Sequence, residues 1–232
     1  VVDGRMMVAL RPYSSKTVQS DENHRFNVNL DSGSMDLIEK IQSKCPTKLE
    51  LLCDVKSGIM TNGEALLVDK KKNKNCKPLL RGKNIGRGVI VGDSGFIEYD
   101  QDLAKKYKYQ LRDENIFLAS PKIIIRQTGD SLICAIDQNQ RYTLKNTHVI
   151  LIRDKAKATL ENYKAIAAVL NSRVMNYLYQ CRVPERNRAM AEVKADYIKA
   201  LPLPPLESLV AAGLHKLYDS LKEVERGEKA ET

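Results

Sequence analysis

The stretch Pro121–Arg153, which reads PKIIIRQTGDSLICAIDQNQRYTLKNTHVILIR, decides the fold class. It contains four short runs rich in β-branched and other apolar residues, and polar turn residues separate these runs. Such a pattern is typical of antiparallel strands. The runs predicted as strands are Lys122–Gln127, Ser131–Ile136, Arg141–Lys145 and Thr147–Arg153. We therefore expect a meander of antiparallel strands in this part of the chain.

Shorter signals precede this stretch. Ser34 and Asp36 can cap a short helix whose apolar residues, between Leu37 and Ile41, face inward. A second, polar helix is expected over residues 102–112. The other segments predicted as strands are Phe26–Leu30, Leu49–Val55, Val89–Val91 and Gly95–Tyr99.

Helical patterns follow the strands. Thr159 can cap a helix in which apolar residues between Tyr163 and Cys181 recur every three or four positions. The segment Tyr197–Pro205 contains three prolines, so it cannot continue a helix and is predicted to be extended. Pro205 suits the first turn of a last helix, whose apolar face we expect to pack on its own domain. That face consists of Leu206, Leu209, Val210, Leu214, Leu217, Leu221 and Val224.

The predicted fold class is α+β. The sheet is expected to be strongly twisted and antiparallel, or a partial β-barrel, with helices packed beside it and a helix at the C-terminus. A chain of 232 residues with 43% hydrophobic residues can bury a core of its own. No apolar run approaches the roughly 20 residues of a transmembrane helix, and we expect no membrane association. The five scattered cysteines favour a reducing, cytoplasmic location.

The net charge of +9 is unevenly distributed. Residues 61–90 hold eight cations against two anions, and residues 120–205 hold fourteen cations against seven anions. Clustered cations indicate a polyanionic partner, because neutralising phosphates releases bound counterions. The lysine run between Lys70 and Lys77 alone is interpreted as a solvated polar loop. The glycine-interrupted cations of Lys77–Arg87 and the block Pro121–Gly129 together point to DNA.

Residue types within these blocks suggest individual roles. Arg81 and Arg87 are expected to reach the groove, whereas Lys83 and Lys122 are expected to contact phosphates. Since strand residues alternate faces, Lys122, Ile124, Arg126 and Thr128 are predicted to share one side, opposite Ile123, Ile125 and Gln127. The alternative for Arg126 is an internal ion pair with Asp130 or Asp137. The predicted DNA-binding residues are Thr61, Asn62, Arg81, Lys83, Asn84, Arg87, Lys122, Arg126 and Thr128.

Signatures of catalysis are missing from the sequence. It contains no phosphate-binding glycine loop and no nucleophile elbow, and its three histidines are isolated. Glu50, Asp54 and Lys56 faintly resemble the metal cluster of many nucleases, but their apolar neighbours favour a core strand. We therefore expect neither a catalytic residue nor a metal site in this chain.

Five motifs occur in an order that resembles a known family. They are Gly58–Asn62, Lys77–Gly86, Pro121–Arg126, Ala168–Ser172 and Leu201–Pro204. Together they resemble the TaqI-like C-terminal specificity domain of type II adenine DNA methyltransferases and of methyltransferases fused to nucleases. The resemblance implies that this domain reads a short sequence in duplex DNA. It also implies that a neighbouring domain flips out an adenine and methylates it from S-adenosylmethionine.

The resemblance sets the expected domain organisation. The tetrapeptide that holds a flipped adenine is absent, so we expect the catalytic domain and its S-adenosylmethionine to lie upstream, outside this chain, which does not begin with methionine. The expected partners are double-stranded DNA and that methyltransferase domain. The expected segments are residues 1–25 as a linker, 26–205 as the DNA target recognition domain, and 206–232 as a C-terminal helix with a frayed tail.

Two alternatives remain open from the sequence. The chain could be a specificity subunit whose terminal helix docks a separate methyltransferase. It could also be a non-specific nucleic-acid-binding domain, including one that binds RNA. Three phenylalanines and no tryptophan leave few rings to stack on unpaired bases, which disfavours the RNA-binding alternative.

Overall fold

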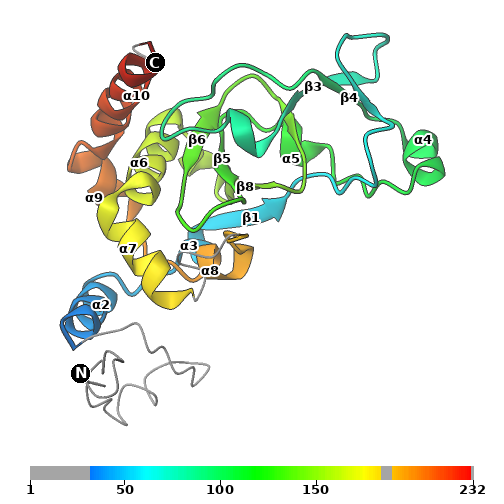
Figure 1. Ribbon diagram of the computed structural model, residues 1–232. Helices are drawn as coiled ribbons and strands as arrows, with labels where there is room; N and C mark the ends of the chain where they lie inside the picture. Colours follow the sequence, from blue (N-terminus) through cyan, green and yellow to red (C-terminus); the bar gives the residue numbers. More distant parts are fainter. Residues whose placement is uncertain (1–31, 184–189, 231–232) are drawn as a thin grey trace, which may run out of the picture. The chain divides into compact units, whose positions relative to one another are not determined.

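Figure 1 shows the computed structural model, which describes residues 32–183 and 190–230. The chain divides into two compact units, Val1–Lys44 and Cys45–Thr232. In the first unit, helix α2 (Ser32–Lys44) confirms the predicted short helix, but it begins before Ser34, so Ser34 and Asp36 lie within it rather than capping it, and Leu37 is exposed rather than inward. The predicted strand Phe26–Leu30 and the predicted linker 1–25 lie outside the described residues. No helix in the described part of the chain is long and apolar enough to cross a membrane.

The second unit contains two four-stranded sheets. The first has the order β1–β8–β5–β6, and all its strands are antiparallel to their neighbours. The second has the order β2–β4–β3–β7, in which β3 and β7 run parallel. The strands are β1 (Cys53–Ser57), β2 (Leu67–Val68), β3 (Cys76–Leu80), β4 (Phe96–Glu98), β5 (Lys122–Arg126), β6 (Cys134–Asp137), β7 (Tyr142–Thr143) and β8 (Thr147–Ile152). The α+β class is confirmed, and the described residues form two sheets without a closed barrel.

The four strands predicted as a meander exist, but they do not form a meander. Strand β5 pairs with β6 on one side and with β8 on the other. Strand β7 leaves this sheet and pairs with β3, where Leu79 lies opposite Tyr142. The physical reason is that Tyr142 is buried in a separate hydrophobic cluster, that of the second sheet.

Strand β5 is buried on both faces, which corrects the predicted alternation. Ile123, Ile124 and Ile125 are fully buried, and so is Lys122. A central strand covered on both faces reads as a continuous apolar run rather than as alternating residues. Arg126, at the end of the strand, is the first of its residues to reach the surface.

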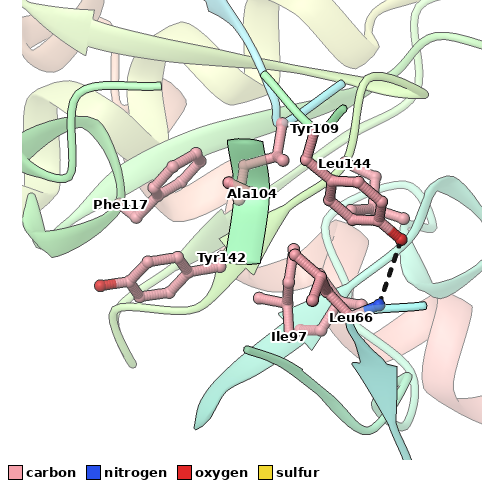
Figure 2. Packing of buried hydrophobic residues seen from close by; sticks show 9 residues of the cluster. Leu66, Ile97, Ala104, Tyr109, Phe117, Tyr142 and Leu144 are labelled. Carbon is pink, nitrogen blue, oxygen red and sulfur yellow. Dashed lines mark hydrogen bonds between the residues drawn. The ribbon is translucent and has the colours of Figure 1, made fainter. Parts of the chain in front are cut away.

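The second sheet has a core of its own, shown in Figure 2. The ring of Phe117 stacks on that of Tyr142 with 4.8 Å between centroids, and Tyr99 meets Tyr142 edge-on at 5.2 Å. Ile97 of β4 and Tyr109, from the segment after α4, belong to the same hydrophobic cluster. Aromatic pairs at these distances add stability beyond their buried area.

Capping residues predicted from the sequence account for some helices of the second unit, and other helix boundaries differ from the prediction. They are α3 (Leu49–Leu52), α4 (Gln101–Lys106), α5 (Asn115–Leu118), α6 (Leu160–Asn171), α7 (Arg173–Arg182), α8 (Ala195–Lys199), α9 (Leu206–Ala211) and α10 (Leu214–Ala230), with short 3-10 turns η1 (Gly82–Asn84) and η2 (Lys155–Lys157). Thr159 caps α6 as predicted, since its side chain accepts from the Asn162 N–H at 3.3 Å. The single helix predicted after it is two helices, because the Ser172 hydroxyl caps α7.

Three further elements differ from the sequence prediction. The terminal helix is divided into α9 and α10 at Gly213, whose positive φ of 74° is a conformation that glycine adopts at little cost. Leu49–Leu52 is helical, so the strand predicted over Leu49–Val55 begins at Cys53. Val89–Val91 forms no strand; only an isolated bridge joins Ile90 to Ile85.

Helix α10 packs on α6 and also holds the first sheet (Figure 1). The buried Tyr218 hydroxyl donates to the Gly88 carbonyl and accepts from the Ile136 N–H, both at 3.0 Å. Lys164 of α6 pairs with Asp219 at 2.7 Å. One residue of the predicted apolar face, Leu217, is nevertheless exposed.

We expect Tyr218→Phe to lower stability by about 1–2 kcal/mol, because the Gly88 carbonyl and the Ile136 N–H both lose a buried partner. Thermal unfolding of the full chain measures this loss. Tyr107→Phe is the matched control, since Tyr107 is exposed on the surface. Equal melting temperatures for the two variants would contradict the assigned role of α10.

Candidate nucleic-acid interface

Asn84 organises the basic loop that follows β3. Its Oδ1 accepts from the Arg81 N–H at 2.9 Å and from the Ser94 hydroxyl at 2.6 Å. Its Nδ2 donates to the Val91 carbonyl at 3.0 Å. Asn84 is only 5% exposed, so it shapes the loop from inside. This corrects the prediction that Asn84 contacts DNA.

Arg81 connects this loop to the turn that follows Gly58. Its Nη1 donates to Glu64 Oε1 at 3.0 Å, and Glu64 itself is largely exposed. The Nε of Arg81 is buried and has no hydrogen-bond partner. The ion pair therefore holds the guanidinium against Glu64, two residues after Asn62 in the turn that also carries Thr61. Asn62 is exposed and Thr61 is half-buried.

Gly82 brings the first basic block against the second. A Cβ at this position would lie 3.1 Å from the Asn146 carbonyl oxygen and 3.5 Å from Arg126 Cγ. The Gly82 N–H also donates to Asn146 Oδ1 at 3.4 Å. Because glycine permits this approach, the η1 loop lies against the end of β5 and the turn between β7 and β8.

Arg126 lies at the centre of this contact. Its Nε donates to the Thr128 hydroxyl at 3.0 Å, and Thr128 is exposed. Among the described residues Arg126 makes no ion pair, and Asp137 instead pairs with Lys122 and Arg141. The alternative of an internal ion pair with Asp130 or Asp137 is therefore not what the structure shows.

We call the resulting surface the Arg81–Arg126 surface. It consists of Asn62, Arg81, Lys83, Arg126, Thr128 and Lys145. Lys83 and Lys145 are exposed, and the Lys145 N–H donates to the Ile59 carbonyl at 2.7 Å, which ties it to the Asn62 turn. Sequence reasoning missed Lys145, and the only signal was its place in a polar turn beside Asn146. Arginines here can fork onto guanine and lysines can neutralise phosphates.

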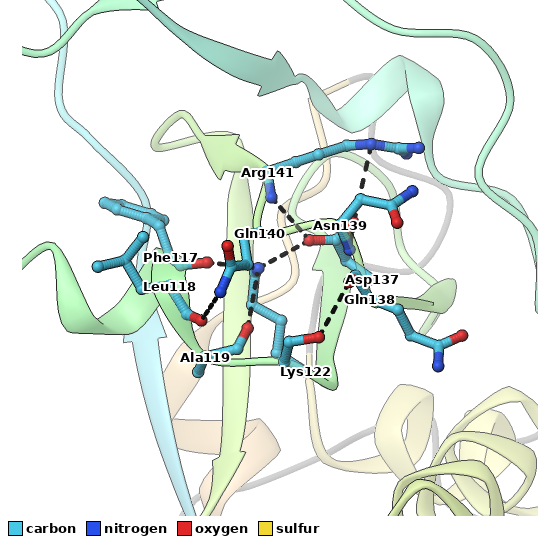
Figure 3. A network of polar contacts seen from close by, with 10 residues as sticks. Phe117, Leu118, Ala119, Lys122, Asp137, Gln138, Asn139, Gln140 and Arg141 are labelled. Carbon is cyan, nitrogen blue, oxygen red and sulfur yellow. Dashed lines mark hydrogen bonds and ion pairs between the residues drawn. The ribbon is translucent and has the colours of Figure 1, made fainter. Parts of the chain in front are cut away.

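Lys122 does not belong to this surface (Figure 3). It is fully buried, and its Nζ donates to Asp137 Oδ2 at 2.7 Å, to the Phe117 carbonyl at 2.7 Å and to the Ala119 carbonyl at 3.2 Å. Burial lowers the pKa of Lys122, and the Asp137 carboxylate opposes this shift. The predicted phosphate contact by Lys122 is wrong, because the side chain is enclosed and holds a polar network together.

Arg87 also has an internal role. Its Nη1 donates to the Leu132 carbonyl at 3.0 Å and to the Asn171 carbonyl at 3.2 Å. Asn171 is the last residue of α6, and a cation at a helix C-terminus is favourable there. Arg87 is half-buried and these bonds fix the loop to α6, whereas the sequence prediction placed Arg87 in the groove.

The Ala168–Ser172 motif also has a structural role, through the side chain of Asn171. The Asn171 side chain accepts from the Cys134 N–H at 3.1 Å and donates to the Cys134 carbonyl at 2.9 Å. It therefore extends the edge of β6 with a side-chain amide. Through the buried Asn171, this motif joins α6 to the first sheet.

The faint nuclease motif forms no metal site in the structure. Asp54 pairs with Arg153 at 3.1 Å across β1 and β8. Within residues 32–183 and 190–230, no three His, Cys, Asp or Glu side chains gather closely enough to hold a metal ion. His148 is buried, its Nε2 lies 2.8 Å from the Val193 carbonyl, and burial lowers its pKa. These groups lie in or beside the first sheet, where they make an ion pair and a hydrogen bond.

Comparison with known proteins identifies the family. The sequence profile of the TaqI-like C-terminal specificity domain matches residues 77–203, more than half of the chain. This chain belongs to that family. The matched segment contains Arg81, Lys83, Arg126 and Lys145, so most of the Arg81–Arg126 surface lies within the specificity domain. The Asn62 turn and α10 lie outside the match.

Other comparisons are more distant. No curated protein matches this chain. Among solved structures, the HsdS subunit from Thermoanaerobacter tengcongensis is 15% identical, with a TM-score of 0.45 over 85% of this chain and 45% of that one. A structure titled for complex assembly and conformational transition of the type I R-M system is 14% identical, with a TM-score of 0.45 over 85% of this chain and 47% of that one. The chain thus spans about half the length of these two structures.

Proposed function

We propose that this chain is a DNA target recognition domain that reads a short duplex sequence through the Arg81–Arg126 surface. The single observation that carries this proposal is the approach of Gly82 to Arg126. This approach unites two basic segments, about forty residues apart in sequence, into one surface. Membership in a family of specificity domains of restriction-modification systems supports the same role.

The contacts suggest a division of labour on this surface. Glu64 holds one edge of the Arg81 guanidinium, and its carboxylate disfavours close approach of a phosphate. Arg81 is therefore suited to base edges, where an arginine can bind guanine O6 and N7. Arg126, oriented by Thr128, is placed to do the same, whereas the exposed amide of Asn62 suits adenine. Lys83 and Lys145 are free to neutralise phosphates.

The chemistry belongs, in this proposal, to a partner domain. We propose a cytoplasmic adenine DNA methyltransferase that binds S-adenosylmethionine, because the chain has neither the adenine-holding tetrapeptide nor a glycine-rich cofactor loop. The methyltransferase could be fused to this domain or be a separate subunit that the chain docks. Co-purification of the chain with a separately expressed methyltransferase would support the second arrangement.

Alanine variants test the proposed surface. A random-sequence duplex library first yields the preferred site, and fluorescence anisotropy then compares that site with scrambled duplexes. We expect Arg81→Ala and Arg126→Ala each to cost about 1–3 kcal/mol on the preferred site and to relax one position. Lys83→Ala is expected to weaken all sequences alike and to lower the salt slope by about one.

The control is Arg173→Ala, which removes an exposed arginine from α7. It is expected to leave binding unchanged. If the two surface arginines behaved like this control while the proteins stayed folded, the assignment of the surface would be wrong. Equal affinity for single-stranded and duplex DNA would favour the non-specific nucleic-acid-binding alternative.

A further inference from the structure

Lysines from two separate segments lie at the outer end of the second sheet. One group belongs to the loop between β2 and β3, and the other to the end of α4 and the turn that follows it. We call them together the lysine tip. It consists of Lys70, Lys71, Lys72, Lys74, Lys105, Lys106 and Lys108, all of which are exposed. Figure 1 places α4 at the end of this unit opposite to α6 and α9.

Side-chain contacts hold the lysine loop against the start of α4. Asn73 Nδ2 donates to Glu98 Oε1 at 2.8 Å, and Asn75 Nδ2 donates to Asp100 Oδ2 at 3.1 Å. Asp100 also caps α4, since its other oxygen accepts from the N–H groups of Asp102 and Leu103. The fold therefore anchors both groups of lysines to the same three-residue stretch, 98–100.

The lysine tip carries an excess of positive charge. The same contacts engage the two neighbouring acids, Glu98 and Asp100, with amides and with a helix N-terminus. None of the seven lysines forms an ion pair with a described residue. Residues 69–74 and 98–108 together hold seven lysines against four acids, which are Asp69, Glu98, Asp100 and Asp102. A single lysine run suggests a solvated loop, but two anchored groups form a basic surface.

We propose that the lysine tip binds the DNA backbone beside the sequence that the Arg81–Arg126 surface reads. This inference rests on the proposed function. Strand β3 joins the lysine loop directly to Arg81, and its five residues span roughly 17 Å at about 3.4 Å per residue. Duplex DNA rises about 3.4 Å per base pair, so this span corresponds to about five base pairs. The lysine tip contacts phosphates at that distance, on one side of the site.

The chemistry of lysine suits this role. Its ammonium is a mobile point charge, so it contacts phosphates without the fixed geometry that base reading requires. Phosphate contacts add affinity by counterion release and fix the register of the protein on the duplex. The lysine tip therefore contributes affinity and register and does not discriminate between sequences.

Two neutralised variants test this inference in the full chain. They are K70Q/K71Q/K72Q/K74Q and K105Q/K106Q/K108Q. The control K155Q/R173Q/K216Q removes three exposed cations from η2, α7 and α10. On the preferred duplex, we expect each tip variant to lower the salt slope by about two or more, and the control by less than about one. The ratio of preferred to scrambled affinities is expected to stay unchanged.

Shortening the duplex provides a second readout. When the flank on one side falls from about ten to about two base pairs, wild-type affinity is expected to fall on the order of tenfold. The K70Q/K71Q/K72Q/K74Q variant, already without these contacts, is expected to show almost no response. Thermal unfolding confirms that each variant is folded.

Several outcomes would overturn the inference. One is that a tip variant lowers the salt slope no more than the control K155Q/R173Q/K216Q does. Another is that shortening the flank still weakens binding by K70Q/K71Q/K72Q/K74Q. The third is that a tip variant changes the ratio of preferred to scrambled affinities. Unchanged DNA binding together with loss of a co-purifying subunit would assign the tip to an acidic protein instead. If the wild-type chain preferred no sequence, the proposed function would fail, whereas the salt slope would still decide the inference on non-specific duplex.

Discussion

Lys122→Met is expected to destabilise the chain by about 3–5 kcal/mol, because it leaves the buried Asp137 carboxylate without its main partner. The carbonyls of Phe117 and Ala119 lose their donor in the same step. Methionine fills nearly the same volume, so packing contributes little to the loss. Thermal unfolding should show a melting temperature lower by roughly 10 °C.

Lys157→Met is the matched control for this change. Lys157 pairs with Glu207 at 2.8 Å, but both side chains are exposed. An exposed pair contributes about 0–1 kcal/mol, so this variant should melt close to wild type. The comparison also separates the two roles considered for Lys122. A phosphate contact predicts normal melting with weakened DNA binding, and that result would refute the buried network.

The wrong prediction for Lys122 shows the limit of strand periodicity as evidence for which side chains are exposed. Alternation assumes that one face of a strand meets solvent, and that assumption made Lys122 a companion of Arg126. The three consecutive isoleucines, Ile123–Ile125, were the contrary signal, since an unbroken apolar run indicates a strand covered on both faces. The sequence does not show that Asp137, fifteen residues later, lies opposite Lys122 in the hairpin.

Local signals predicted local structure well. Thr159 caps α6, strands β5 and β8 lie within their predicted runs, and Pro205 directly precedes α9. Pairing between distant segments was not predictable. The parallel pairing of β7 with β3 depends on Tyr142 and Leu79, which are more than sixty residues apart. No periodicity within either segment specifies that contact.

The same holds for the candidate site, where local features were predictable and contacts between distant segments were not. Composition and glycine spacing drew attention to the two basic blocks, and the structure joins them through Gly82 and Arg126. The sequence could not tell which cations turn inward, because Arg87 and Lys122 find backbone carbonyls contributed by other elements. A cation near a predicted helix end or among apolar residues is therefore a weaker candidate than one in an exposed turn, such as Lys83.

Tyr142→Ala is expected to cost about 3–5 kcal/mol, the range for truncating a large buried aromatic residue. Its ring is 1% exposed, stacks on Phe117 and meets Tyr99 edge-on, so truncation leaves a cavity at the centre of the cluster in Figure 2. Tyr142→Phe keeps the ring and removes only the hydroxyl that donates to Glu114. That variant should lose about 1 kcal/mol.

The same substitution tests the link between the second sheet and DNA. Tyr142 lies opposite Leu79 of β3, and β3 leads directly into Arg81. Loosening this pairing frees the end of β3 that leads into Arg81, whereas the other end stays paired with β4, so Tyr142→Ala should weaken binding at Arg81, below its melting temperature. Anisotropy at low temperature measures this effect, with Tyr142→Phe as the control. If Tyr142→Ala bound the preferred duplex as tightly as Tyr142→Phe did, the DNA surface would not depend on the second sheet.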